Sequence, residues 1–143
     1  MKMTKKGSAV WSGGIKEGKG SISTESGALV NFPYGFNARF EGGKGTNPEE
    51  LLGAAHAGCF TMALSKILGE AKLTAERMET NAQVTLEQKG DSFEITSVHL
   101  TLRAKVPGAT QESFSELANK AKTGCPVSKL FKTEITLVTF LEP

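Results

Sequence analysis

The chain has 143 residues, a length typical of one globular domain, and we expect residues 1–143 to form a single domain. Its 17 basic and 15 acidic residues leave a formal net charge of +2, and the lysines do not cluster, so the composition does not favour nucleic acid as a partner. The 2 histidines, 2 cysteines and one aspartate lack the spacing of a metal site, so we expect no metal and no other cofactor.

The N-terminal sequence bears on the cellular location. It begins MKMTKKGSAVW, with basic residues but no apolar run behind them, and so lacks the pattern of a secretory signal. We therefore expect a cytoplasmic protein in a reducing environment. A lasting structural disulfide is not expected there, whereas a transient catalytic disulfide is compatible with it.

The first third of the chain is rich in β-prone stretches separated by glycines. Strands are predicted for residues 9–11, 15–23 and 35–40. The segment 26–34 has no clear period and is predicted to be a loop. A glycine-rich turn at residues 42–46 then leads into the strongest helix start in the sequence.

This helix is predicted from residue 48 to about residue 70. Asn47 can cap it, Pro48 suits its first position, and Glu50 can return the second bond of a capping box. Apolar residues cover nearly every face of the helix, a pattern typical of burial in a core, an oligomer interface or a membrane. They are Leu51, Leu52, Ala54, Ala55, Ala57, Cys59, Phe60, Met62, Ala63, Leu64, Ile67 and Leu68.

Burial against protein is the better interpretation of this helix. Its stretch without formal charge runs only from residue 51 to residue 65, shorter than the ~20 residues that span a bilayer, so we expect no membrane insertion. Covering an all-apolar helix in so small a protein indicates a partner subunit. Gly53 and Gly58 would let another backbone approach closely.

The rest of the chain predicts an α+β fold with mainly antiparallel strands. Two long strands flank the turn Lys89-Gly90-Asp91, and a change of apolar parity indicates a bulge near residues 96–97 of the second strand. The predicted elements are strands at 80–88 and 92–106, a helix at 110–123, a short helix from Pro126 to about 131, and a closing strand at 134–141.

The two cysteines leave several interpretations open. Cys59 lies inside the long helix, where it is either a buried apolar residue or a reactive thiol. Cys125 precedes Pro126 and is a candidate N-cap residue, a position where amide donors favour a thiolate. His56 precedes Cys59 by three positions on the same side of the helix, which permits a Cys–His nucleophile but is more typical of a histidine packed in an interface. Arg39 either points into water or supplies the charge that turns Cys59 into a thiolate.

Four ordered blocks carry a family resemblance over nearly the whole chain. They are PYGFNARFEG at 33–42, GTNPEEL at 45–51, AAHAGCF at 54–60 and AKTGCPVS at 121–128. In these blocks the chain resembles the OsmC and organic hydroperoxide resistance family. The resemblance implies an intertwined homodimer with mainly antiparallel sheets packed around long central helices, and two active sites at the subunit interface.

The resemblance also implies an activity and its residues. Cys59 matches a peroxidatic cysteine, Cys125 the resolving cysteine, Arg39 an activating arginine and Glu49 the carboxylate that orients it. Cys59 would reduce an organic hydroperoxide to an alcohol and become a sulfenic acid, which Cys125 converts to a disulfide. An external dithiol, for which a lipoyl group is a candidate, would then reopen that bond.

The side chains expected to bind the alkyl group of the substrate are Phe36, Phe60 and Met62. Glu49 and Cys59 are ten residues apart, or ~15 Å along an unbroken helix at about 1.5 Å per residue. We therefore expect either that Arg39 and Glu49 complete the site around Cys59 of the other subunit, or that the helix breaks between them. The alternative functions are a dimeric protein that binds a small apolar ligand, with inert cysteines, and a hydrolase built on Cys59 and His56.

Overall fold

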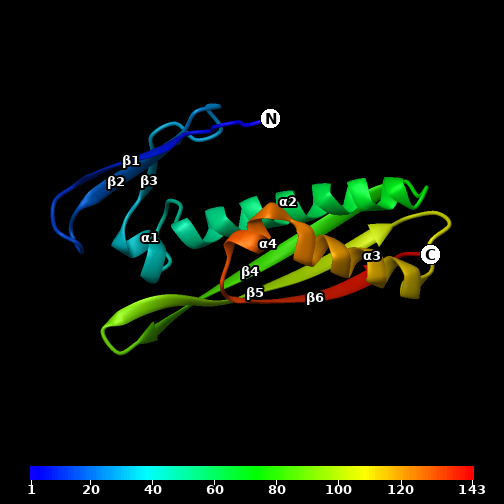
Figure 1. Ribbon diagram of the computed structural model, residues 1–143. Coiled ribbons are helices and arrows are strands. Elements are labelled where there is room, and N and C mark those ends of the chain that lie inside the picture. The colour runs from blue at the N-terminus through cyan, green and yellow to red at the C-terminus, as the bar shows by residue number, and fades with distance from the viewer. The chain divides into compact units, whose positions relative to one another are not determined.

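The computed structural model describes residues 1–143, and its backbone contacts form two compact units, Met1–Leu51 and Leu52–Pro143 (Figure 1). The boundary falls inside the long helix α2, Pro48–Glu70, which matches the predicted helix. That the whole chain acts as one domain stays a prediction.

The first unit contains a three-stranded antiparallel sheet in the order β1-β2-β3, made of Gly7–Ser12, Lys19–Thr24 and Phe32–Tyr34. The loop predicted for residues 26–34 is wrong at its end, because β3 pairs with β2. A three-residue strand is too short to show a period in the sequence. It lies at the edge of the sheet, where Pro33 is tolerated because an edge strand does not need every amide hydrogen.

The strand predicted for residues 35–40 is also wrong, because Phe36–Phe40 forms the short helix α1. The two phenylalanines that looked like alternating strand residues are four positions apart, which places them together on one turn of a helix. Their ring centroids lie 4.9 Å apart, and the amide of Arg39 donates to the carbonyl of Gly35.

The second unit is a mixed sheet with helices on one face (Figure 1). Its strands are β4 (Arg77–Lys89), β5 (Ser92–Lys105) and β6 (Glu134–Leu141). β4 and β5 pair antiparallel, whereas β5 and β6 pair parallel. A parallel pair needs a crossover, and here it consists of α3 (Gln111–Gly124) and α4 (Pro126–Leu130). The predicted α+β class is confirmed, with antiparallel pairing predominating over the two sheets.

The bulge predicted near residues 96–97 is confirmed. Thr85 pairs with Ser97 and Leu86 pairs with Ile95, so Thr96 is the extra residue on β5. The bulge explains the change of parity in the sequence, because it lets Ile95 and Val98 point to the same face of the sheet.

The hydrophobic core lies between this sheet and its helices. One stripe of α2, at spacings of three or four residues, is buried: Gly53, His56, Phe60, Leu64 and Leu68. Gly53 meets the backbone of β4, where an added Cβ would lie 3.2 Å from the carbonyl oxygen of Ala82. The other core side chains are Val98, Leu100, Leu102, Ala104, Val106, Phe114, Ala118, Ala121 and Cys125.

Part of the apolar surface of α2 is uncovered in the single chain. Ala54, Ala55, Gly58 and Met62 are exposed. By length and composition alone α2 could cross a membrane, and 28% of that apolar window is buried within the chain. Core helices of soluble proteins pass the same test.

Candidate active site

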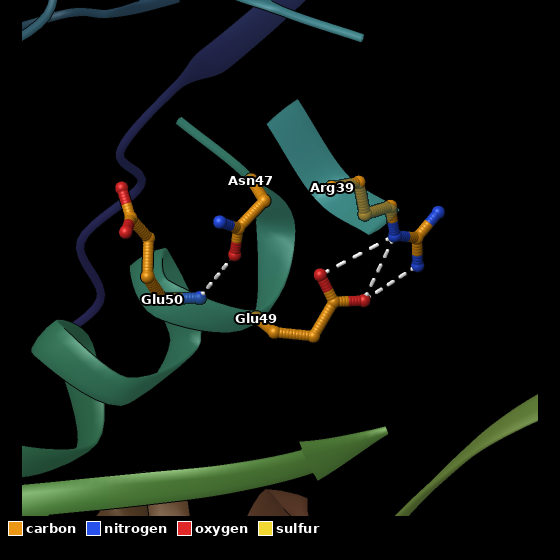
Figure 2. Close-up of polar contacts among 4 residues, drawn as sticks. All are labelled: Arg39, Asn47, Glu49 and Glu50. Atoms are coloured by element: carbon orange, nitrogen blue, oxygen red, sulfur yellow. Dashed lines mark hydrogen bonds and ion pairs between the residues drawn. The ribbon is translucent and has the colours of Figure 1, made fainter. Parts of the chain in front are cut away.

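The first turn of α2 carries Glu49, the carboxylate predicted for the site. Asn47 caps the helix as predicted, because its side-chain oxygen accepts from the Glu50 amide at 2.8 Å (Figure 2). The predicted return bond from Glu50 is wrong: its carboxylate instead accepts from the Thr46 hydroxyl at 2.7 Å. Glu49, the residue before Glu50 on the first turn, faces Arg39.

Arg39 and Glu49 form a forked ion pair (Figure 2). The Nη2 of Arg39 donates to Oε1 of Glu49 at 2.6 Å, and Nε donates to Oε1 at 3.0 Å and to Oε2 at 3.3 Å. The Glu49 side chain is 11% exposed and that of Arg39 is 36% exposed. The carboxylate therefore holds the guanidinium in a fixed orientation while leaving part of it accessible.

An apolar hollow lies beside this pair in the first unit. It has a volume of about 280 Å³, and Phe36 lines it together with Arg39. That Phe36 contacts the substrate stays a prediction. The full lining is Trp11, Ile15, Tyr34, Gly35, Phe36, Arg39, Phe40 and Pro48. The hollow thus combines aromatic walls with a single cationic group.

The second unit brings the two cysteines together. Cys59, half-buried on α2, and Cys125, fully buried, are free thiols whose side chains hydrogen-bond to each other. Cys125 occupies the N-cap position of α4, as predicted. The backbone amides of Val127 and Ser128 act on its sulfur, although the side chain makes no capping bond of regular geometry. The contact itself was not predictable from the separation of the cysteines in the sequence.

The two thiols have opposite pKa shifts. Burial raises the pKa of Cys59, and the hydrogen bond to Cys125 raises it further. Burial alone would also raise the pKa of Cys125, but hydrogen bonds from Cys59 and from Ser128 outweigh it and lower that pKa. Within a single chain, the negative charge of the pair is therefore favoured on Cys125.

An open groove of about 810 Å³ exposes Cys59 to solvent. Met62 lines this groove beside Cys59, and its predicted contact with the alkyl group of the substrate stays a prediction. Phe60 does not line it, because its side chain is fully buried in the core. The lining residues are Cys59, Met62, Ala63, Ser65, Lys66, Ile67, Gly124 and Pro126.

His56 is packed inside the chain rather than in an interface. It is fully buried, its ring lies edge-on to Phe131 at 5.2 Å, and burial lowers its pKa. Its Nε2 lies 2.8 Å from the hydroxyl oxygen of Ser128, and not against Cys59, which gives the Cys–His hydrolase no structural support. Sequence reasoning missed Ser128. Its signal was the spacing of three residues from the N-cap Cys125, which lets an N3 side chain reach back to the cap.

Known proteins resemble this chain over nearly its full length. The chain is 56% identical over 137 residues to the peroxiredoxin OsmC of Escherichia coli, covering 96% of each sequence. It is 34% identical over 110 residues to the organic hydroperoxide resistance protein OhrB of Bacillus subtilis, covering 77% of this chain and 79% of that protein. The crystal structure of OhrB superposes with a TM-score of 0.69 at 28% identity, covering 98% of each chain. The sequence model of the OsmC-like proteins matches residues 41–139, and the chain belongs to this family.

Proposed function

We propose that this protein is a peroxiredoxin-like enzyme that reduces organic hydroperoxides to alcohols with Cys59 and Cys125. The observation that carries the proposal is the hydrogen-bonded pair of free thiols, in a chain 56% identical to a peroxiredoxin. The accessible Cys59 opens to a groove, and the buried Cys125 lies behind it. This is the order that a peroxidatic and a resolving thiol require.

The proposed reaction has three steps. The Cys59 thiolate attacks one peroxide oxygen, the O–O bond breaks, and the alkoxide takes up a proton and leaves as an alcohol. Cys59 is then a sulfenic acid, which Cys125 attacks to form a disulfide and release water. An external dithiol, such as a lipoyl group, reduces the disulfide by exchange.

Arg39 and Glu49 serve this reaction by electrostatics. The fork holds the guanidinium so that its remaining donors can stabilise the Cys59 thiolate and bind the peroxide oxygens. The alternative of a helix broken between Glu49 and Cys59 is wrong, because α2 is continuous from Pro48 to Glu70. We therefore assign Arg39 and Glu49 to the Cys59 of a partner subunit in a homodimer.

The proposal is tested by peroxide consumption with a dithiol supplied. We expect Cys59→Ser to abolish turnover of cumene hydroperoxide, because no thiolate is left to attack the peroxide. When the supplied dithiol is limiting, we expect Cys125→Ser to stop consuming peroxide and to accumulate a sulfenic acid on Cys59. Mass spectrometry after one equivalent of peroxide should show a disulfide between Cys59 and Cys125 in the wild-type chain.

Turnover by Cys59→Ser at the wild-type rate would overturn the proposal. A wild-type protein that consumes no peroxide with any dithiol would favour the binding of a small apolar ligand instead. The aromatic hollow lined by Trp11, Tyr34 and Phe36 is the place where such a ligand would fit.

A further inference from the structure

A buried hydrogen-bond chain that the proposed reaction does not yet use leads from His56 to the two cysteines. The Nε2 of His56 lies 2.8 Å from Oγ of Ser128, and the Ser128 hydroxyl in turn hydrogen-bonds to Cys125. Cys125 hydrogen-bonds to Cys59. His56 and Cys125 are fully buried and Ser128 is 7% exposed, so water does not compete for these contacts.

The other ring nitrogen of His56 fixes the direction of this chain. Nδ1 is buried and has no hydrogen-bond partner. A proton on Nδ1 would leave a buried N–H donor unsatisfied, which is rarer and costlier in proteins than an unfilled acceptor. The hydrogen bonds therefore assign the proton to Nε2, which donates to Ser128 Oγ. Ser128 Oγ then accepts from His56, which leaves its own hydrogen available for the hydrogen bond to the sulfur of Cys125.

We propose that His56 is a positioning residue for the resolving step: by donating to Ser128, it holds the Ser128 hydroxyl as a donor to Cys125 and so stabilises Cys125 as the attacking thiolate. The inference rests on the proposed peroxidase function and extends it to residues that touch neither peroxide nor Cys59. Cys125 is the only member of the pair that receives a hydrogen bond from a buried hydroxyl.

The resolving step balances with these groups alone. The thiolate of Cys125 attacks the sulfur of the Cys59 sulfenic acid, an S–S bond forms, and the S–O bond breaks. The hydroxide that leaves takes up the proton that Cys125 carried as a thiol, and water is released. The Ser128 hydroxyl stabilises the thiolate without giving up its own proton, so neither His56 nor Ser128 changes its protonation state over the step.

The surroundings of Cys125 agree with this assignment. The groups that lower its pKa are Cys59, the hydroxyl and amide of Ser128, and the amide of Val127. The charged side chain that lines the adjoining groove is Lys66 on α2, on the side of Cys59. Cys125 is thus stabilised as a thiolate by a neutral donor, the buried hydroxyl of Ser128, and not by a positive charge of the same chain.

The first test titrates Cys125 without any peroxide. In a Cys59→Ser background, the thiolate absorbance of Cys125 is followed against pH. We expect Ser128→Ala to raise its apparent pKa by about one unit, because one hydrogen bond to the thiolate is lost. Ser128→Thr keeps the hydroxyl and should keep the pKa, whereas an unchanged pKa in Ser128→Ala would overturn the inference.

The second test is a double-mutant cycle on the resolving step, measured by rapid quenching and mass spectrometry as sulfenic acid turns into disulfide. His56→Leu and Ser128→Ala should each slow this conversion about tenfold, and the double variant should be no slower than Ser128→Ala alone. His56→Gln keeps an N–H donor near the position of Nε2 and should restore most of the rate. A His56→Leu effect that persists in full in the Ser128→Ala background would contradict action through Ser128.

The two proposals fail in different ways. A wild-type chain that reduces no peroxide would remove the proposed function, while the titration of Cys125 would still report on His56 and Ser128. If the wild-type protein reduces peroxide but Ser128→Ala leaves the pKa of Cys125 unchanged, only the inference on His56 and Ser128 is overturned. If His56→Leu does not fold, His56→Asn replaces it, because its shorter amide ends near the position of Nδ1 and cannot donate to Ser128. In the Cys59→Ser background His56→Asn should raise the apparent pKa of Cys125 and His56→Gln should not, and equal values in the two variants would overturn the inference.

Discussion

The Arg39–Glu49 fork is the side-chain ion pair of the first unit. Two guanidinium nitrogens share one carboxylate, and the carboxylate is nearly buried on the first turn of α2. Ion pairs elsewhere in the chain are more exposed to solvent, as in Arg77 and Glu79 at 68% and 60%, and are held less firmly. The fork is thus better shielded from solvent than these pairs, which suits the catalytic role proposed for it.

Replacing Arg39 by lysine tests this role. Lysine keeps the charge but lacks the planar set of donors, so we expect Arg39→Lys to lower kcat/KM for an organic hydroperoxide about 100-fold. Arg77→Lys is the matched control and should leave kcat/KM unchanged, because its ion pair is solvent-exposed. An Arg39→Lys variant as active as the control would exclude Arg39 from the site.

How much of the site was predictable differs from residue to residue. The family-like blocks identified four candidate residues, Cys59, Cys125, Arg39 and Glu49. In the structure Arg39 forms an ion pair with Glu49, and Cys59 contacts Cys125. Their catalytic roles stay predictions. Ser128 was not predictable in the same way, because its importance comes from a partner on α2 that lies far away in the sequence.

Long elements were predictable and short ones were not. α2, α3 and the β4–β5 hairpin repeat their apolar pattern over several turns or pairs, so the signal accumulates. α1 and β3 have five and three residues, and their state depends on the strand or turn beside them. The parallel pairing of β6 could not be read from its sequence, since parallel and antiparallel strands share the same alternation.

The close contact of α2 with β4 gives a prediction on stability. Gly53→Ala and Gly69→Ala make the same change on the same helix, but only position 53 has the carbonyl of Ala82 at 3.2 Å and Val84 at 3.5 Å from the added Cβ. We expect Gly69→Ala to raise the free energy of unfolding. The free energy of unfolding of Gly53→Ala should be lower than that of Gly69→Ala by about 1 kcal/mol or more. Denaturant unfolding measures both free energies. Equal values would show that β4 shifts to accommodate the added methyl group without loss of stability.

The two units differ in how they bury apolar surface. Every buried core side chain belongs to the second unit, whereas Val10, Ile15 and Val30 of the first unit are exposed. About 50 residues without a core of their own do not account for a stable fold. Together with the uncovered apolar side of α2, this supports the proposed homodimer.

A charge on the uncovered side of α2 tests the assembly. We expect the wild-type chain to sediment with the mass of two chains. Met62→Glu should shift it toward a monomer and lower peroxidase activity in parallel, because an unpaired carboxylate would be buried in the interface. Asn119→Glu adds the same charge on the exposed side of α3 and should sediment as the wild type does. A wild-type monomer with full activity would contradict the dimer.

The contact between Cys59 and Cys125 also links catalysis to chain entropy. One sulfur belongs to α2 and the other to the crossover between β5 and β6. A disulfide between them closes a loop of roughly 65 residues, and the conformational entropy that the unfolded chain loses stabilises the folded state by about 4 kcal/mol. The proposed cycle would therefore alternate between a loosely and a tightly constrained protein. The reducing dithiol would restore the less stable form at each turnover, and an oxidised chain waiting for reductant would be the one better protected against unfolding.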